Sequence, residues 1–261
     1  INAYYGDKPL NCVQIGDSCV SSECRGKGLF QRMNKQFLTE FFPDGDLIYN
    51  ISVLQSKISY EKLGWIYIKS LTSIFKIVNP IKTLFKIRFN IKKLTGTRIW
   101  DNSQTKINIK EALLNIREKQ LRELNLIHIN YDVTTFNWRQ GTHSGIKCFE
   151  NDYGCIIYKI GTIRKCELSI ADIGEIFLYK YDRKHFNGIL KDFIKCVKPE
   201  ILQTSICYKH PLYKFYKKAS FIDNPRHKFL YHGVRVNTDE MRNIALNPNN
   251  WGICTLDIDT F

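Results

Sequence analysis

The segment that decides the fold reads Val20-Ser21-Ser22-Glu23-Cys24-Arg25-Gly26-Lys27-Gly28-Leu29. Before it, the apolar side chains of residues 10–20 roughly alternate, which predicts a strand. After it, apolar side chains recur every four residues, at Leu29, Met33, Phe37 and Phe41. That spacing predicts a helix that ends before Pro43. The segment is therefore predicted to be a glycine-containing turn from a strand into a helix.

The residues that follow extend this pattern. Residues 47–51 are predicted to form a second short strand, and a helix through residues 60–63 is predicted to stop at Gly64. Residues 65–68 have strand character again. The order strand, loop, helix, strand, helix, strand predicts the α/β (α+β) class, with a mixed sheet flanked by helices.

The turn has the composition of a phosphate-binding loop. Gly26 and Gly28 remove two side chains where the helix starts, and the backbone N–H groups of a helix start are unpaired and carry partial positive charge. A pyrophosphate group suits such a site. Arg25 and Lys27 would add charge-assisted contacts. The alternative is an ordinary turn in which glycine only relieves the backbone.

Arg25-Gly26-Lys27-Gly28 resembles the acyl-CoA loop of the GNAT N-acetyltransferases, whose pattern is Gln/Arg-x-x-Gly-x-Gly/Ala. Arg25 and Gly28 match this pattern, whereas Phe30 stands where the family usually has a small residue. The resemblance implies that acetyl-CoA, or another acyl-CoA, is the co-substrate. The cofactor-binding residues that it implies are Cys19, Val20, Arg25, Gly26, Lys27, Gly28, Leu29, Phe30 and Ser56, with Cys19 and Val20 contributing main-chain contacts.

A second signature lies about 30 residues downstream. The run from Ser56 to Trp65 is similar to the family's Tyr-x-Lys-x-Gly-Phe helix ending, in which the Tyr lies near the sulfur of CoA. The resemblance implies that Tyr60 is the catalytic residue that protonates the leaving thiolate, and that a backbone N–H near Val20 holds the oxyanion. The general base is not identified. Its candidates are Asp17, Glu23 and His143.

The chain contains an internal similarity. Tyr60-Glu61-Lys62-Leu63-Gly64-Trp65 resembles Tyr216-Lys217-Lys218-Ala219-Ser220-Phe221, and the predicted order of elements around the two runs agrees. We expect two tandem GNAT-like domains: residues 1–96, which bind acyl-CoA and include a basic connector at 66–96, and residues 97–261, which are degenerate. Because the resemblance lacks the family's opening elements, the first domain is expected to be truncated at its N-terminus.

The second half has its own predicted elements. A helix is expected at 109–124 and another at about 187–197, with β-rich runs at 127–130, 154–160, 166–170 and 175–179. Where a glycine loop would stand, residues 181–186 read Tyr-Asp-Arg-Lys-His-Phe, so no CoA binding is expected there. Arg139 lies in the aromatic run Phe136-Asn137-Trp138-Arg139. It is a candidate to hold an anionic substrate group, or else a solvent-facing residue on an aromatic strand.

Charge is concentrated in one stretch. The net charge is +14, and residues 66–100 contain eight basic residues and no acid. Within this stretch, residues 85–92 alternate apolar and polar side chains with period two. The favoured interpretation is a linker with solvated charges. Contact with an anionic membrane surface or a nucleic acid is the alternative.

Cysteine usage indicates a reducing compartment. The nine cysteines form no Cys-x-x-Cys pair, and free, mostly buried thiols are typical of cytoplasmic proteins. Cys207 and His210 offer two potential zinc ligands without a second pair at a useful spacing, so we expect no metal. No run approaches the ~18 apolar residues of a membrane span. The expected location is the cytoplasm.

These observations favour an enzyme that transfers an acetyl or other acyl group from acyl-CoA to the amine of a small molecule, for which an amino sugar is the working choice. Two alternatives stay open. One is a tRNA-dependent aminoacyl ligase with tandem GNAT-like domains, which the positive charge would suit. The other is a non-catalytic binding module that retains the fold. The sequence does not indicate the oligomeric state.

Overall fold

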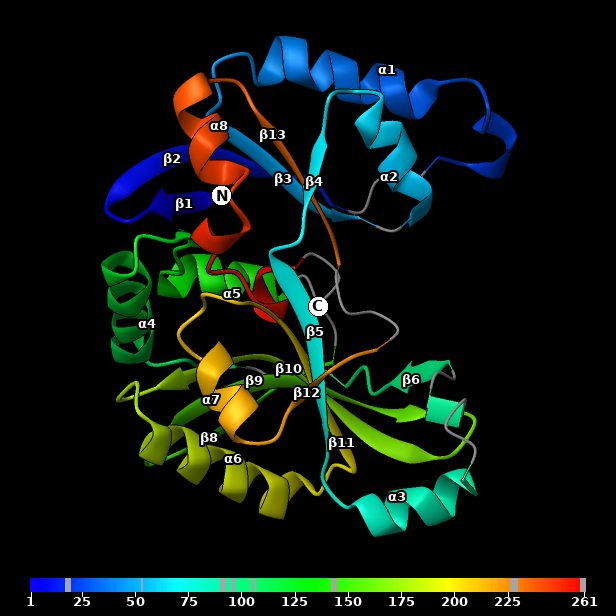
Figure 1. Cartoon of the computed structure of the whole chain (residues 1–261), viewed down its shortest axis with the longest axis vertical. Helices are drawn as coiled ribbons and strands as arrows, with labels where there is room; N and C mark the ends of the chain where they lie inside the picture. Colours follow the sequence, from blue (N-terminus) through cyan, green and yellow to red (C-terminus); the bar gives the residue numbers. More distant parts are fainter. Residues whose placement is uncertain are drawn as a thin grey trace.

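The computed structural model describes residues 1–16, 20–52, 54–89, 93–94, 97–103, 105, 107–141, 145–225 and 230–258. The chain forms two β-sheets, one above the other in Figure 1, with helices on their outer faces and between them. The α/β class expected from the sequence is confirmed.

The first sheet has six strands, in the order β4 (Ile66–Ile68), β13 (Tyr231–Val236), β3 (Leu47–Ser52), β2 (Lys8–Gln14), β1 (Asn2–Tyr5) and β7 (Ile127–Ile129). Only β2 and β3 run parallel to each other; the other neighbours are antiparallel. Helix α1 (Leu29–Gln36) and a π-helical turn (Phe37–Phe41) connect β2 to β3, and α2 (Leu54–Glu61) connects β3 to β4.

The second sheet has seven strands. Their order is β12 (Ile222–Asp223), β5 (Leu71–Ile77), β11 (Ile201–Cys207), β10 (Leu168–Leu178), β9 (Gly154–Ile163) and β6 (Arg98–Trp100), and β8 (Ile146–Asn151) also pairs with β9. Here β10 and β11 are the parallel pair. Helix α6 (Arg183–Val197) connects them, and α7 (Tyr213–Lys218) connects β11 to β12.

The two sheets repeat one topology and exchange one strand. The series β4, β13, β3, β2, β1 has the same order and strand directions as the series β12, β5, β11, β10, β9. The strand that follows β4 in the chain, β5, enters the second sheet, and the strand that follows β12, β13, returns to the first. The crossing is tied by a 2.6 Å hydrogen bond between Ser70 Oγ and His232 Nδ1 and by Leu230 N donating to Leu71 O at 3.2 Å.

The exchange bears on the proposed domains. The connector expected at 66–96 contains β4, β5 and α3 (Pro80–Ile87), so part of it belongs to the second sheet, while β7 and β13 complete the first. The division at residue 96 stays a proposal, as does the tandem duplication that the repeated topology supports.

Three local expectations are corrected. Residues 80–87 form helix α3, which Asn79 caps by accepting a hydrogen bond from Lys82 N. Lys82 and Lys86 on this helix pair with the buried Glu200, so this part of the basic stretch is not a linker with solvated charges. The β-rich runs at 166–170 and 175–179 belong to one strand, β10, which is interrupted by a bulge between Ile173 and Glu175. Residues 136–139 lie in helix α5 (Val133–Gly141) rather than in a strand.

The remaining elements fill the space between the sheets. Helix α4 (Glu111–Glu123) and α5 lie there, and the chain returns through α8 (Asp239–Ala245) into a buried C-terminal segment, residues 251–258, with a 3-10 turn at Thr255–Asp257. A single large core cluster draws residues from both sheets. In the described part of the chain, no helix is long and apolar enough to span a membrane.

Candidate functional site

The glycine loop adopts a conformation that depends on glycine. Gly26 and Gly28 have φ angles of +77° and +69°, which L-residues with a side chain rarely adopt, and a Cβ built at either one meets no heavy atom within 4 Å. Residues 25–28 are all exposed. The loop therefore presents bare backbone to solvent directly before α1.

Its base is fixed by local hydrogen bonds. A 3-10 turn (Ser22–Cys24) precedes the loop, and Arg25 Nε donates to Val20 O at 3.3 Å. The first helical hydrogen bond runs from Arg32 N to Gly28 O at 3.0 Å. The N–H groups of residues 29–31 therefore have no acceptor within the helix, which is the arrangement that binds anions. Leu29 is the first helical residue and is half-buried.

Phe30 and Tyr60 belong to one aromatic cluster. The ring centroids of Phe30 and Tyr60 lie 5.0 Å apart in an edge-to-face arrangement, and those of Tyr60 and Trp65 lie 4.8 Å apart. Tyr60 and Trp65 are buried. The bulk of Phe30, where the GNAT pattern has a small residue, is thus directed into the core rather than over the loop. Ser56 lies one turn before Tyr60 on α2 and is half-buried.

The parallel strands next to this cluster separate. Cys12, Val13 and Gln14 of β2 pair with β3, and Ile15 N donates to Tyr49 O at 3.0 Å. Strand β3 continues to Ser52, with its other edge paired along its whole length to β13. The ladder between β2 and β3 therefore ends before β3 does. We call the place where it ends the first split.

Of four further residues proposed from the sequence for the site, the structure describes one. Glu23 is exposed in the 3-10 turn. Asp17, Cys19 and His143 lie outside the described residues. The structure thus brings the loop, Phe30 and Tyr60 together and leaves the general base unassigned.

The second sheet repeats the aromatic cluster. Phe186, Tyr216 and Phe221 stand 156 residues after Phe30, Tyr60 and Trp65, with centroid distances of 5.0 and 4.8 Å to the central Tyr216. The same offset places Asp182 at the position of Gly26. The Asp182 carboxylate accepts hydrogen bonds from His185 N at 2.8 Å and from His185 Nδ1 at 2.9 Å. The start of α6 is therefore already capped by an anion.

The split of the second sheet is filled by the chain itself. Strands β10 and β11 pair up to Asp172 and Gln203, while β11 continues to Cys207 with its other edge covered by β5. On the edge facing β10, Ser205 N donates to Thr255 Oγ1 at 2.6 Å and Cys207 N donates to Ile253 O at 3.0 Å. A bridge joins Ile206 to Cys254. Residues 253–255 thus lie between the two strands, as a short substitute strand.

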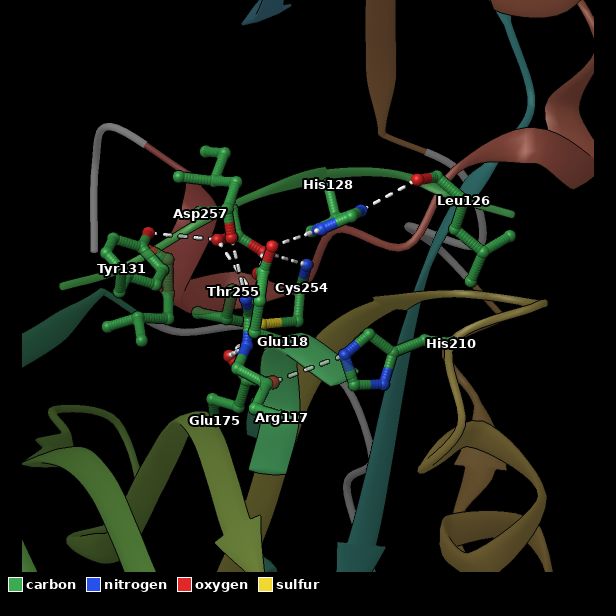
Figure 2. Close-up of polar contacts among 12 residues, drawn as sticks. Arg117, Glu118, Leu126, His128, Tyr131, Glu175, His210, Cys254, Thr255 and Asp257 are labelled. Carbon is green, nitrogen blue, oxygen red and sulfur yellow. Dashed lines mark hydrogen bonds and ion pairs between the residues drawn. The ribbon is translucent and has the colours of Figure 1, made fainter. Parts of the chain in front are cut away.

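A buried polar network holds this segment (Figure 2). Arg117 Nε contacts Glu175 Oε2 at 2.8 Å, and Arg117 Nη2 lies 3.4 Å from both carboxylate oxygens of Asp257. Asp257 also accepts from Tyr131 Oη at 2.9 Å and from Cys254 N at 2.8 Å. Burial by itself would raise the pKa of Glu175, but the neighbouring Arg117 and His210 lower it to about 2. One guanidinium therefore binds two buried carboxylates from distant parts of the chain.

Glu175, His210 and Cys254 place potential metal-ligand atoms within 4.8 Å of one another. The hydrogen bonds favour a polar core over a metal site. His210 Nδ1 accepts from Leu212 N at 3.3 Å, so a neutral imidazole carries its proton on Nε2, which faces Glu175 Oε1 at 3.3 Å. The Cys254 thiol donates to Glu175 Oε2 at 3.4 Å. Cys207, the other zinc candidate, is not part of this group.

No local pattern in the sequence indicates this network. Arg117 lies in the helix expected at 109–124, where a charged side chain usually faces solvent, yet it is fully buried. Arg139 is also buried, and its Nε donates to Leu256 O at 3.0 Å, so it is neither a solvent-facing residue nor placed to hold an anionic substrate. Both side chains bind the C-terminal segment, and only the folded chain shows where that segment lies.

Comparisons with known proteins agree on the fold. No protein-family model matches the sequence, and no curated protein matches it. Among solved structures, a GCN5-related N-acetyltransferase from Anabaena variabilis aligns with a TM-score of 0.54 at 13% identity, over 89% of this chain and 57% of the other. A GCN5-related N-acetyltransferase from Kribbella flavida also aligns with a TM-score of 0.54, at 10% identity, over 94% of this chain and 56% of the other. The chain has the GNAT fold, as the sequence resemblance implied, and spans little more than half the length of these structures.

Proposed function

Starting from this fold, we propose that the chain transfers an acyl group from acyl-CoA to the amine of a small molecule. One observation carries the proposal: the helix that begins at the exposed glycine loop places Phe30 against Tyr60, next to the end of the ladder between the parallel strands β2 and β3. The equivalent place in the second sheet is capped and filled. One acyl-CoA per chain is therefore expected.

The loop would bind the pyrophosphate of CoA. Backbone N–H groups at the start of α1 would donate to its oxygens, and the exposed side chains of Arg25 and Lys27 would add charge-assisted contacts. The main chain of Cys19 and Val20 would contact the pantetheine arm along the first split. No metal is required for this binding.

The transfer reaction has three requirements. The amine nitrogen of the acceptor attacks the thioester carbonyl carbon and loses a proton to a base, the carbonyl oxygen carries negative charge, and the C–S bond breaks. Tyr60 would supply the proton to the leaving sulfur. A backbone N–H near Val20 would stabilise the oxyanion. An amino sugar is the working acceptor class.

A second candidate is a tRNA-dependent aminoacyl ligase. The net charge of +14 favours it, because phosphate backbones attract basic proteins. The exposed glycine loop favours acyl-CoA, because a transferase that uses aminoacyl-tRNA has less need of a pyrophosphate cradle. A binding module without activity would keep the CoA site and lack turnover.

The deciding experiment exchanges Gly26 for the residue type found at the equivalent position of the second half. Gly26→Asp places a carboxylate where the pyrophosphate is proposed to lie, and Gly26→Asn is its neutral match. Asp and Asn both tolerate positive φ, and a Cβ fits there without a clash. Titration calorimetry with CoA should show binding by the wild type. It should show a loss of about tenfold or more in Gly26→Asp and a smaller change in Gly26→Asn.

Absence of CoA binding by the wild type, or equal affinity in the two variants, would contradict the proposed site. Filter binding with unacylated tRNA separates the second candidate. Tight tRNA binding together with no CoA binding would favour the aminoacyl ligase.

A further inference from the structure

Helix α3 exposes an apolar stripe at the end of the molecule opposite α1 (Figure 1). Ile81 is 70% exposed, Phe85 71% and Phe89 74%, and Leu84 is also exposed. Positions 81, 84 and 85 lie on one face of a helix. Phe89 follows the helix end, where its N–H donates to Leu84 O at 3.3 Å and holds it beside this face. Large apolar side chains gathered in this way mark an interaction surface.

The orientation of the helix is fixed by its other face. Thr83 and Ile87 are buried, and Ile87 packs in a small core cluster with Ile163, Cys166, Leu168, Ile170 and Ile201. Lys82 and Lys86 reach the buried Glu200 at 3.1 and 2.9 Å. The stripe therefore cannot turn inward without breaking both the apolar packing and these ion pairs.

The rim of the stripe is basic. Arg88 is exposed at the end of α3. The turn from Ile163 to Leu168 packs against the helix, with Lys86 Nζ donating to Glu167 O at 3.0 Å. It exposes two basic residues, Arg164 and Lys165, and one acid, Glu167. Lys198 is exposed two residues before Glu200. We call Ile81, Leu84, Phe85, Phe89 and this basic rim the α3 patch.

We propose that the α3 patch binds the surface of an anionic lipid bilayer. Apolar side chains at the centre would enter the boundary between headgroups and acyl chains, and basic side chains at the rim would contact anionic headgroups. A nucleic acid would neutralise the rim, and its bases could stack on the phenylalanines, but the aliphatic side chains of Ile81 and Leu84 would stay in water. A symmetric contact with a second copy would bring the same basic residues against one another. The bilayer is the partner that satisfies both parts of the patch.

The test compares three variants with the wild-type chain by sedimentation with vesicles. The vesicles contain phosphatidylcholine with or without about one third phosphatidylserine, at ~0.15 M salt, where weak surface attraction is screened. Phe85→Ser with Phe89→Asn removes the apolar centre, and Asn suits the φ of +59° at position 89. Arg164→Ser with Lys165→Ser reduces the positive charge of the rim. Trp138→Ser is the matched control, because Trp138 is an equally bulky exposed residue on α5, outside the patch.

We expect the wild type to sediment with the anionic vesicles and not with the neutral ones. The phenylalanine pair should lose about tenfold or more in partitioning, the rim pair should lose several-fold, and Trp138→Ser should match the wild type. Lys82 and Lys86 are left intact because their removal would strand the buried Glu200. Because α1 lies at the opposite end of the molecule from α3, every variant should have the melting temperature of the wild type. Each should also respond to added CoA as the wild type does.

Three results would overturn the proposal: no vesicle binding by the wild type, binding that survives loss of both phenylalanines, or equal binding to neutral vesicles. Self-association is the other possible role of the patch. It would be assigned if the wild type did not bind vesicles, formed a concentration-dependent oligomer in light scattering, and lost that oligomer in the variant without both phenylalanines.

Discussion

Helices α1 and α6 follow equivalent parallel strands in the two sheets, and they begin in opposite ways. Helix α1 starts after Gly28, with bare backbone exposed on both sides of Lys27. Helix α6 starts after Asp182, whose carboxylate already accepts the hydrogen bonds of the first turn. A helix start can hold an external anion only where the protein has not supplied one of its own.

The parallel strands beside these helices stop pairing before their longer partners end. In the first sheet the ladder between β2 and β3 ends while β3 continues to Ser52, and in the second sheet residues 253–255 pair with β11 beyond the end of its ladder with β10. The aromatic clusters around Tyr60 and Tyr216 nevertheless share one geometry. Two copies of one framework therefore differ in whether the helix start is exposed or capped and in what lies beside the parallel strands. The predictions below address these differences.

The largest expected effect is on the network that holds the filled split. Arg117→Met leaves the carboxylates of Glu175 and Asp257 buried without their cation, which should cost about 3–5 kcal/mol in the free energy of unfolding. Urea denaturation measures it. Arg122→Met is the control, because Arg122 pairs with Glu118 and Asp7 at the surface of the same helix and should cost about 1 kcal/mol or less. Similar losses in the two variants would mean that the network does not hold the segment.

The second effect concerns rate. Tyr60→Phe should lower turnover by about 10²-fold if its hydroxyl protonates the leaving sulfur. Tyr216→Phe should leave the rate per folded molecule unchanged and cost about 1 kcal/mol of stability at most. Release of free thiol from acetyl-CoA, with a set of amino sugars and amino acids as acceptors, measures both. Equal turnover in wild type and Tyr60→Phe, with chemistry rate-limiting, would remove Tyr60 from the mechanism.

The third effect concerns the pH dependence that the buried His232 gives to stability. Burial lowers the pKa of His232, at the strand crossing, to about 3 from a usual 6.5. Between these pH values the unfolded chain binds a proton that the folded chain does not, so stability falls as the pH drops below ~6.5, by up to about 1.4 kcal/mol per pH unit. His232→Asn should flatten this slope in urea melts at pH 7, 6 and 5. An unchanged slope would mean that His232 titrates normally in the folded protein.

The smallest effect concerns the cap itself. Asp182→Ala removes the acceptor for His185 N and should cost about 1 kcal/mol, while Asp182→Asn, which caps equally well, should cost less. Thermal melts can resolve this difference. If the alanine variant is as stable as wild type, the carboxylate of Asp182 contributes nothing to the start of α6, and the contrast with α1 rests on the glycines alone.

Much of the first half of the fold could be predicted from local signals. The helix before Pro43, the stop at Gly64 and the strands at 47–51 and 65–68 are all present, because each depends on side-chain periodicity or on a backbone that only glycine tolerates well. The resemblance of the Tyr60 and Tyr216 runs is matched by equivalent clusters in space. The roles assigned to Tyr60 and the glycine loop stay predictions.

The failures have a common cause. Residues 80–87 form a helix because Asn79 and Pro80 provide a strong helix start, and because Thr83 and Ile87 find a buried surface on the second sheet. The β-rich runs around 173 merge because β9 pairs across the bulge. Arg139 is buried because the C-terminal segment, more than a hundred residues later, lies against it. Apart from the helix start at Asn79 and Pro80, none of these partners is local.

In the first 70 residues, the sequence by itself determined where the backbone turns and which short segments are helical or extended, since neighbouring side chains and glycine conformations decide those choices there. It also placed Gly26, Gly28 and Tyr60 in a pattern typical of acyl-CoA transferases. Only the tertiary structure decided which sheet each strand joins, because an extended segment gains its hydrogen bonds from whichever edge the rest of the chain presents. The exchange of β5 and β13 and the filling of the second split follow from that long-range competition.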